Sequence, residues 1–268
     1  SLGAGLVFDV RFTPVFRISA DSTRVAYFAD PDGDGQFTLF SAALAGGGAL
    51  LALGPIVPAS SSPDEFLLSA DSTRAVYRGA GGQLLVARLD GGAPPLLLAT
   101  LAPQDGLLEF ALTPDSSRAV YRGRTTNLGP AELFSVPLDG SAPAQRLHGP
   151  LPADAGVGTP LSDSQAQVFQ LTPDSRRVVF VGDLRVAGQF ELYSAPLDAS
   201  AAPRVESGPL VGGGDATSNS YGRTDFRLSP RGERVFYLAD QEQDDVFELF
   251  ATFLTRSARR AETPAPRV

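Results

Sequence analysis

The stretch "LTPDSSRAVYR" at residues 112–122 recurs four more times along the chain, and this recurrence decides the fold. Related copies begin at residue 18 ("ISADSTRVAYF"), 68 ("LSADSTRAVYR"), 171 ("LTPDSRRVVFV") and 228 ("LSPRGERVFYL"). A second shared block follows each copy, with "FELYSAPLDAS" at 190–200 as a complete example. The repeat is marked, at intervals of 44 to 59 residues, by Asp21, Asp71, Asp115, Asp174 and Arg231. A period of this length is typical of repeat architectures with one supersecondary unit per copy.

Each unit is predicted to form four short β-strands. The first strand ends at the Leu-Ser or Leu-Thr pair, and the Asp-Ser turn leads into a second strand such as 118–122. The third strand is 190–197 in the fourth unit, and "LDGG" at 89–92 turns the chain into a fourth strand such as 95–100. The second strand is apolar at successive positions, as expected when both faces of a sheet are covered. Sheets stacked face to face satisfy this requirement.

The repeated pattern Asp-Ser-x-Arg-x-x-Tyr/Phe, followed by "ELYSxPLDG", resembles the WD40-like repeat of TolB-type β-propellers over residues 15–255. The resemblance implies an all-β propeller with one four-stranded blade per unit. We therefore predict a single domain over 1–268 with five blades, and a flexible C-terminal tail over 256–268. The stretch 5–11 is predicted to supply the fourth strand of the last blade. Six blades, as in TolB, and an incompletely closed ring remain alternatives.

Composition limits the partners of the chain. Thirty acidic residues against 22 basic ones give a net charge of −8, which argues against nucleic acid and against an anionic membrane surface. No apolar run reaches the 18 residues of a membrane-spanning helix, so no membrane insertion is expected. Methionine is absent, so Ser1 does not begin a translated chain, and a mature exported protein or an excised domain is favoured. We expect a bacterial periplasmic or extracellular protein, since the family resemblance includes envelope and secreted proteins.

Length variation is concentrated on one side of the predicted sheets. Alternating strand direction places the first and third turns of each unit on one side and the other loops opposite them. The variable stretches 49–64, 148–166 and 207–224 are on the second side, where binding sites usually lie. The alternative is that these stretches are insertions without a function, because a surface loop can lengthen at little cost in folding free energy. The candidate binding-face residues are Asp64, Glu65, Asp163, Asp215, Asn219 and Tyr221.

Several catalytic classes are excluded by residue content. His148 is the only histidine, and the sequence has neither a cysteine nor a G-x-S-x-G motif, which argues against a serine triad and a histidine-rich zinc site. His148 is itself predicted to be a solvated loop residue. The arginine three residues after each marker is predicted to form a local ion pair, of little energetic weight. The repeated aromatic residues of the second and third strands are predicted to pack between blades.

The stretch "DPDGDGQF" at 30–37 has the spacing of a calcium loop. Its candidate ligands are Asp30, Asp32, Asp34 and Gln36. Ser41 occupies the position where an EF-hand has its bidentate glutamate, so any calcium site here would be incomplete and weak. A turn between two strands is the competing interpretation, because every unit has a loop at this point. A poorer copy consists of Asp240, Glu242 and Asp244.

Two function classes follow from these observations. The first is a non-enzymatic scaffold or interaction module that needs no cofactor and binds a protein partner through its loop-rich face. The alternative is a carbohydrate-binding or glycosidase-like propeller with paired acids at the mouth of the channel. The acids that would suit this chemistry are Asp64, Glu65, Glu109, Asp163 and Asp225.

Overall fold

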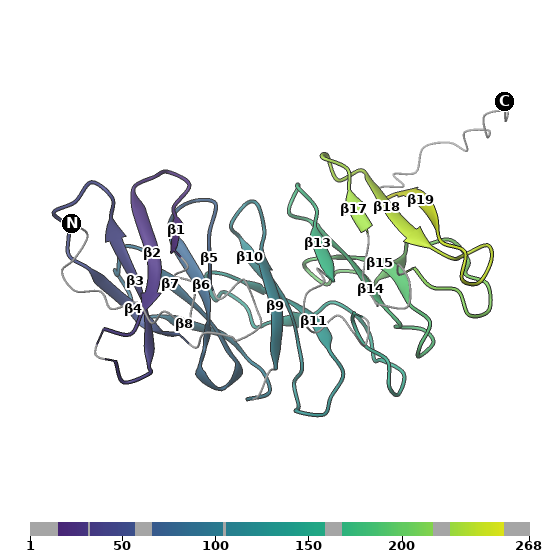
Figure 1. Cartoon of the computed structure of the whole chain (residues 1–268), viewed down its shortest axis with the longest axis horizontal. Helices are drawn as coiled ribbons and strands as arrows, with labels where there is room; N and C mark the ends of the chain where they lie inside the picture. Colours follow the sequence, from purple (N-terminus) through teal and green to yellow (C-terminus); the bar gives the residue numbers. More distant parts are fainter. Residues whose placement is uncertain are drawn as a thin grey trace.

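The computed structural model describes residues 16–31, 33–56, 66–103, 106–158, 168–216 and 226–254. These residues form an all-β structure with five antiparallel sheets, one for each sequence repeat. Within every sheet the strands follow one another in sequence order. The five sheets stand in a row that runs from the N-terminal to the C-terminal repeat (Figure 1). The predicted all-β class and the division into one sheet per repeat are therefore confirmed.

The strands have the following bounds. The first sheet consists of β1 (Phe16–Ile18), β2 (Arg24–Ala29), β3 (Phe37–Ala43) and β4 (Leu51–Ile56), and the second of β5 (Phe66–Leu68), β6 (Arg74–Gly79), β7 (Gln83–Arg88) and β8 (Leu96–Thr100), with a 3-10 turn η1 (Ala80–Gly82) before β7. The third consists of β9 (Leu107–Leu112), β10 (Arg118–Gly123), β11 (Glu132–Pro137) and β12 (Gln145–Arg146), and the fourth of β13 (Phe169–Leu171), β14 (Arg177–Gly182), β15 (Glu191–Pro196) and β16 (Arg204–Val205). The fifth consists of β17 (Phe226–Leu228), β18 (Arg234–Ala239) and β19 (Glu248–Phe253).

The turn between the first two strands of each sheet depends on one left-handed residue. Ser116 has φ 60°, and its N–H donates to the carbonyl oxygen of Thr113 at 2.9 Å. The equivalent serines of the other repeats have φ between 59° and 61°. In the fifth repeat Gly232 takes this position with φ 69°, a conformation that glycine adopts without the steric cost of a Cβ. Arg-Gly therefore forms the same turn in the fifth repeat that Asp-Ser forms in the other four.

Neighbouring sheets pack face to face through one repeated arrangement. Val76 of β6 and Leu84 of β7 share an apolar cluster with Phe110 of β9 and Tyr121 of β10. Equivalent residues form the clusters at the other three junctions of the row. Within the third sheet the rings of Tyr121 and Phe134 stack at 5.2 Å between centroids. The predicted packing of the repeated aromatic residues between blades is confirmed for the second to fifth repeats, whereas Tyr27 and Phe40 cluster with residues of their own sheet.

The row has two distinct sides. On the first, here called the marker-turn side, the N–H of Leu138 after β11 donates to the carbonyl of Ser117 in the marker turn at 3.0 Å. On the opposite side, the N–H of Gly156, in the loop that leads to the fourth sheet, donates to Asp183 in the loop between β14 and β15 at 2.6 Å. We call this opposite side the loop face. The predicted separation of turns and loops is therefore present in the structure.

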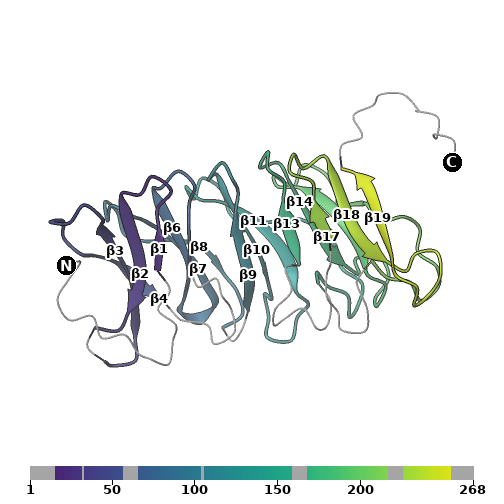
Figure 2. The same cartoon turned by 45° about the horizontal axis from the view of Figure 1, so that its top comes forward.

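The arrangement differs from the predicted ring in two respects. The fifth sheet has three strands in the part of the chain that is described, whereas the other four sheets have four. The stretch 5–11, predicted to complete it, and the predicted tail at 256–268 lie outside the described residues. The first and fifth sheets lie at opposite ends of the row in both views, so the described strands do not close into a ring (Figures 1 and 2). Part of the predicted loop 49–64 is the strand β4.

Candidate functional site

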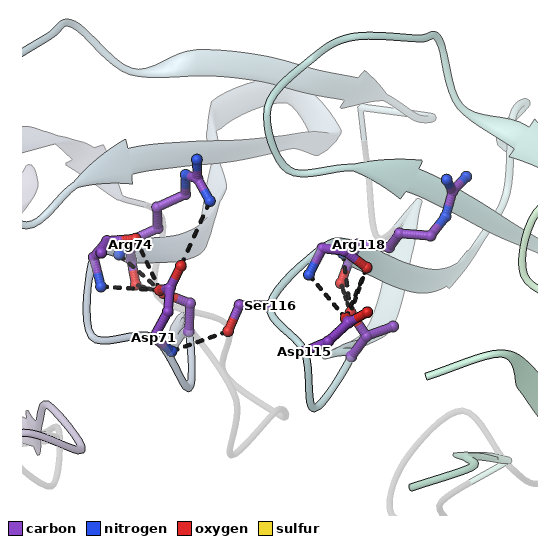
Figure 3. A network of polar contacts seen from close by, with 9 residues as sticks. Asp71, Arg74, Asp115, Ser116 and Arg118 are labelled. Carbon is purple, nitrogen blue, oxygen red and sulfur yellow. Dashed lines mark hydrogen bonds and ion pairs between the residues drawn. The ribbon is translucent and has the colours of Figure 1, made fainter. Parts of the chain in front are cut away.

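The marker turns connect consecutive sheets through a hydrogen bond from backbone to side chain. In the second repeat, the N–H of Asp71 donates to Oγ of Ser116 in the third sheet at 3.0 Å (Figure 3). The carboxylate of Asp71 accepts from the Oγ of Ser69 at 2.5 Å and from the N–H of Thr73 at 3.0 Å. The same bond between sheets joins Asp21 to Ser72 and Asp115 to Ser175, each at 3.0 Å. The repeated Asp-Ser pair therefore ties each of the first three repeats to the next one.

The marker acid of the first repeat, Asp21, is held in the ionised form. Hydrogen bonds from the Ser19 hydroxyl and the Thr23 amide lower the pKa of Asp21 below its usual value. Hydrogen bonding to the charged form of a carboxylate has this effect because it stabilises the anion. A carboxyl group with a lowered pKa is a poor proton donor at neutral pH. This side of the row therefore favours a structural role for the marker carboxylates.

The repeated arginines have a different partner from the predicted one. Arg118 donates from Nε to Oγ of Ser135 on β11 at 2.6 Å, and Arg24 donates in the same way to Ser41 on β3 at 2.8 Å. A local ion pair of the predicted kind joins Arg74 to Asp71, with 3.8 Å between Nη1 and Oδ2. The second repeat has valine where β3 and β11 have serine, so its arginine lacks the hydroxyl partner. The prediction of a local ion pair is thus wrong for the repeats in which the third strand supplies a serine.

On the loop face, aspartates at the end of the second strand accept hydrogen bonds from backbone amides of the loop that follows. Asp30 accepts from the N–H of Gly33 at 2.9 Å and from that of Gly35 at 2.8 Å. Asp183 and Asp240 each accept a backbone N–H from the residue five positions on, at 2.8 and 3.0 Å. The turn interpretation of these aspartates is therefore supported by direct contacts.

The predicted calcium ligands are only partly brought together. Asp34 accepts from the N–H of Gln36 at 2.8 Å and from its side-chain amide at 3.1 Å, so these two residues contact each other. Asp32 lies outside the described residues. In the fifth repeat, a group of carboxylates with oxygens within 4.8 Å of one another consists of Asp240, Asp244 and Asp245. Calcium binding at either loop stays a prediction.

Asp215 is the one predicted binding-face residue within the described part of the chain. The other five, Asp64, Glu65, Asp163, Asn219 and Tyr221, lie outside the described residues. Burial, together with the negative charges of Asp240, Asp244 and Asp183, raises the pKa of Asp215 above its usual value. Its Oδ1 accepts the N–H of Phe190 at 2.8 Å. The Asp215 carboxylate therefore holds the Phe190 amide in place, but its negative charge is unfavourable because the group is partly buried among other acids.

The acids considered for carbohydrate chemistry are not assembled as a pair in the described structure. Asp64, Glu65, Asp163 and Asp225 lie outside the described residues. Glu109 is described, and its Oε1 lies 3.6 Å from Nε of Arg122. An ion pair with a buried guanidinium favours a structural role for Glu109.

His148 is buried, so its prediction as a solvated loop residue is wrong. Its side chain folds back onto the third sheet, where the N–H of Leu133 donates to Nε2 at 3.4 Å. Its Nδ1 lies 2.8 Å from the carbonyl oxygen of Gly149. Burial lowers the pKa of His148, which favours the neutral imidazole that these two contacts require.

Sequence reasoning missed three exposed aliphatic residues on the loop face. They lie in the loops between the second and third strands of the third, fourth and fifth sheets, and we call them the loop tips. The exposed fractions are 101% for Leu128, 56% for Val186 and 43% for Val246. Comparison of these loops for apolar content, rather than for length and acids alone, would have found them. The loop tips give three consecutive repeats an accessible apolar contact.

No family model matches the chain, and no curated protein gives a significant match. Solved structures do match. A protein assigned as TolB from Agrobacterium tumefaciens is 14% identical, with 90% of this chain and 78% of that chain covered and a TM-score of 0.47. TolB from Acinetobacter baumannii is 11% identical, with 84% and 51% covered and a TM-score of 0.42. A structure from a study of two prolyl endopeptidases is 14% identical, with 92% and 35% covered and a TM-score of 0.52.

TolB proteins are among these structural neighbours, so the resemblance expected from the sequence repeat is confirmed. At identities of 11% to 14% the likeness concerns the fold alone. The chain spans about half of the Acinetobacter protein and about a third of the prolyl endopeptidase chain. In the part of the chain that is described, there is no helix with the length and hydrophobicity of a membrane span.

Proposed function

We propose that this chain is a non-enzymatic propeller-type scaffold that binds a protein partner through its loop face. The observation that carries the proposal is the row of loop tips, Leu128, Val186 and Val246, on three consecutive sheets. Single exposed apolar side chains are common on protein surfaces, but their recurrence in the same loop of successive repeats is less easily explained without a partner. A partner that spans the third to the fifth sheet would remove all three side chains from water.

The rest of the chain supports a scaffold role because its repeated polar groups already have structural partners. The marker carboxylates, the repeated serines and most of the repeated arginines bond within or between sheets, as described above. A rigid frame of this kind holds variable loops in fixed positions, which is how many binding surfaces are built. The proposal therefore assigns rigidity to the marker-turn side and recognition to the loop face.

Charge on the loop face suggests the chemistry of the partner. The loop between β18 and β19 has three exposed acids close to Val246, namely Glu242, Asp244 and Asp245. We infer a partner surface with an apolar centre for the loop tips and basic side chains next to the fifth sheet. Charges at the rim of an interface mainly increase the association rate, so binding is expected to weaken and slow as salt rises.

The test compares capture of partners by wild-type protein and by a loop-tip variant. Leu128→Ser, Val186→Ser and Val246→Ser are combined, and both proteins are immobilised and exposed to bacterial envelope and secreted fractions. Substitutions at these exposed positions are expected to leave the fold intact, and circular dichroism checks this. A protein retained by the wild type and lost with the variant, with salt-dependent binding, is the expected result. Equal retention by both proteins would rule out the loop tips as the binding surface.

Localisation and the carbohydrate alternative need separate measurements. We infer a periplasmic or extracellular location, and fractionation of cells expressing the native gene tests it. A carbohydrate-active role is favoured by the raised pKa of Asp215 beside Asp240 and Asp244, since such tuning occurs at catalytic acids. Glycan-array binding that is abolished by Asp215→Asn but unaffected by the loop-tip substitutions would favour carbohydrate over protein recognition.

A further inference from the structure

The third repeat has a buried titratable side chain at a position that is not ionisable in two of the other repeats. The exposed fraction of His148 is 7%, and the sequence has no other histidine. The stretch "HGPL" at 148–151 aligns with "SGPL" at 207–210 of the fourth repeat and with "LGPI" at 53–56 of the first. Serine and leucine therefore serve the fold at this position, whereas histidine adds a group that titrates near neutral pH.

The imidazole caps the outer edge of the third strand of its sheet. The N–H of Leu133 on β11 donates to Nε2 of His148 at 3.4 Å. In the fourth sheet, the N–H of Leu192 on β15 donates to Oγ of Ser207 at 3.3 Å. The two sheets therefore make the same contact at the same position, one through a ring nitrogen and the other through a hydroxyl group.

The two hydrogen bonds of the ring determine which nitrogen carries the hydrogen. The carbonyl oxygen of Gly149, 2.8 Å from Nδ1, can only accept a hydrogen bond, so Nδ1 is the donor. The amide of Leu133 can only donate, so Nε2 has no hydrogen. An added proton goes to Nε2 and sets two N–H groups against each other. The charged form of His148 is therefore incompatible with the contact to Leu133, and the serine of the fourth sheet has no such charged form.

The surroundings of the ring oppose its charged form. Burial is the largest influence, and it lowers the pKa of His148 below its usual value. The hydrogen bond to Gly149 and the carboxylate of Glu132 on β11 favour the imidazolium, and the guanidinium of Arg146 on β12 opposes it. Glu132 and Arg146 also form an ion pair, with 2.7 Å between Oε1 and Nη1. Because this carboxylate is already neutralised by a guanidinium, it gives a charged imidazole little compensation.

The segment that begins at the ring bridges two neighbouring sheets of the row. We call residues 148–158 the clasped segment. The N–H of Val157 donates to the carbonyl oxygen of Ala131 at 2.8 Å, at the end of the loop between β10 and β11. The N–H of Gly156 donates to Asp183 at 2.6 Å, in the loop between β14 and β15. The clasped segment therefore contacts two of the three loops that carry the loop tips.

We propose that His148 is an acid-sensitive clasp, in which a proton taken up from water at Nε2 breaks the contact with Leu133 and releases the clasped segment from the third sheet. Release frees the backbone that holds the loops of the third and fourth sheets at their spacing. One consequence rests on the proposed function: a partner that spans the loop tips is bound at neutral pH and released in acid. The contact made by Ser207 in the fourth sheet stays closed over the same pH range.

The single histidine gives the test one unambiguous signal. Nitrogen NMR of the side chain is expected to show the Nδ1–H tautomer at neutral pH and a titration midpoint below the ordinary histidine range. Amide exchange in the same pH series, divided by the intrinsic rate at each pH, reports opening of the clasp. Protection at Leu133 and Val157 is expected to fall by up to about tenfold per pH unit below the midpoint, while protection at Leu192 is unchanged.

His148→Ser is the matched variant, because it gives the third sheet the residue that the fourth sheet has. It is expected to keep the protection of the Leu133 amide at neutral pH and to abolish its dependence on pH. His148→Gln, whose side-chain carbonyl also accepts from Leu133 and does not titrate, is the second variant and is expected to behave in the same way.

Four outcomes would overturn the clasp. They are an Nε2–H tautomer at neutral pH, protection at Leu133 that stays constant through the titration of the ring, an unaltered pH dependence in both variants, and equal loss of protection at Leu133 and Leu192, which indicates general unfolding in acid. These measurements use the chain without a partner. Failure of the loop-tip test would therefore overturn the proposed function and not the clasp.

Discussion

Loss of one hydroxyl group between sheets tests how the repeats are joined. In Ser116→Ala, the N–H of Asp71 loses the Oγ that accepts it at 3.0 Å, at a residue that is 4% exposed. An unmade hydrogen bond of this kind costs about 1 kcal/mol. The left-handed conformation, φ 60°, costs alanine as much as serine, because both have a Cβ. Ser116→Gly loses the same bond but relieves a conformational cost of about 1 kcal/mol, so it is expected to be close to wild type in stability.

Thermal unfolding and amide exchange measure the two consequences. For a chain of this size, about 1 kcal/mol corresponds to a Tm decrease of about 2–4 °C in Ser116→Ala. The Asp71 amide is expected to exchange faster in both variants, while amides of the fifth sheet are unchanged. Wild-type stability together with wild-type exchange at Asp71 in Ser116→Ala would refute the role of the hydroxyl. A glycine variant less stable than the alanine variant would refute the conformational part of the argument.

Three further predictions concern titratable groups. The free energy of unfolding is expected to decrease as the pH falls below 6.5, because the pKa of His148 is lower in the folded chain than when unfolded; His148→Gln should weaken this dependence in denaturant titrations. At pH 7, Asp215→Asn is expected to raise the Tm, because it removes a negative charge from an acidic environment. Asp215→Ala also loses the acceptor for the Phe190 amide, and this loss is expected to lower the free energy of unfolding by about 1 kcal/mol. EDTA is expected to leave the Tm unchanged, since backbone amides already satisfy Asp30, and a decrease of several degrees would indicate a structural ion instead.

The strands were predictable from the sequence because their signals are local and repeated. The marker turn, the apolar second strand and the aromatic pair occur at fixed spacing, so each copy supports the others. The partner of Arg118 was not predictable in this way. Ser135 is 17 residues further on, and only the register of β10 with β11 brings its hydroxyl beside the guanidinium. Proximity in sequence pointed instead to the marker Asp115.

The candidate site was less predictable than the fold. His148 is in a stretch rich in glycine and proline, where sequence gives no sign that the ring returns to Leu133. The exposure of Leu128 and of Leu249 could not be predicted from the sequence either, because other leucines of the repeats are buried. Whether a given apolar residue is covered depends on the neighbouring sheet. The sequence of one repeat does not indicate where in the row that repeat lies.

Hydrogen–deuterium exchange of the complex with a captured partner is the most direct test of the proposed scaffold function. We predict protection in the loops at 124–131, 183–190 and 240–247, which hold the loop tips, and unchanged exchange in the marker turns on the opposite side. Protection confined to the marker turns, with the three loops unaffected, would contradict the assignment of recognition to the loop face.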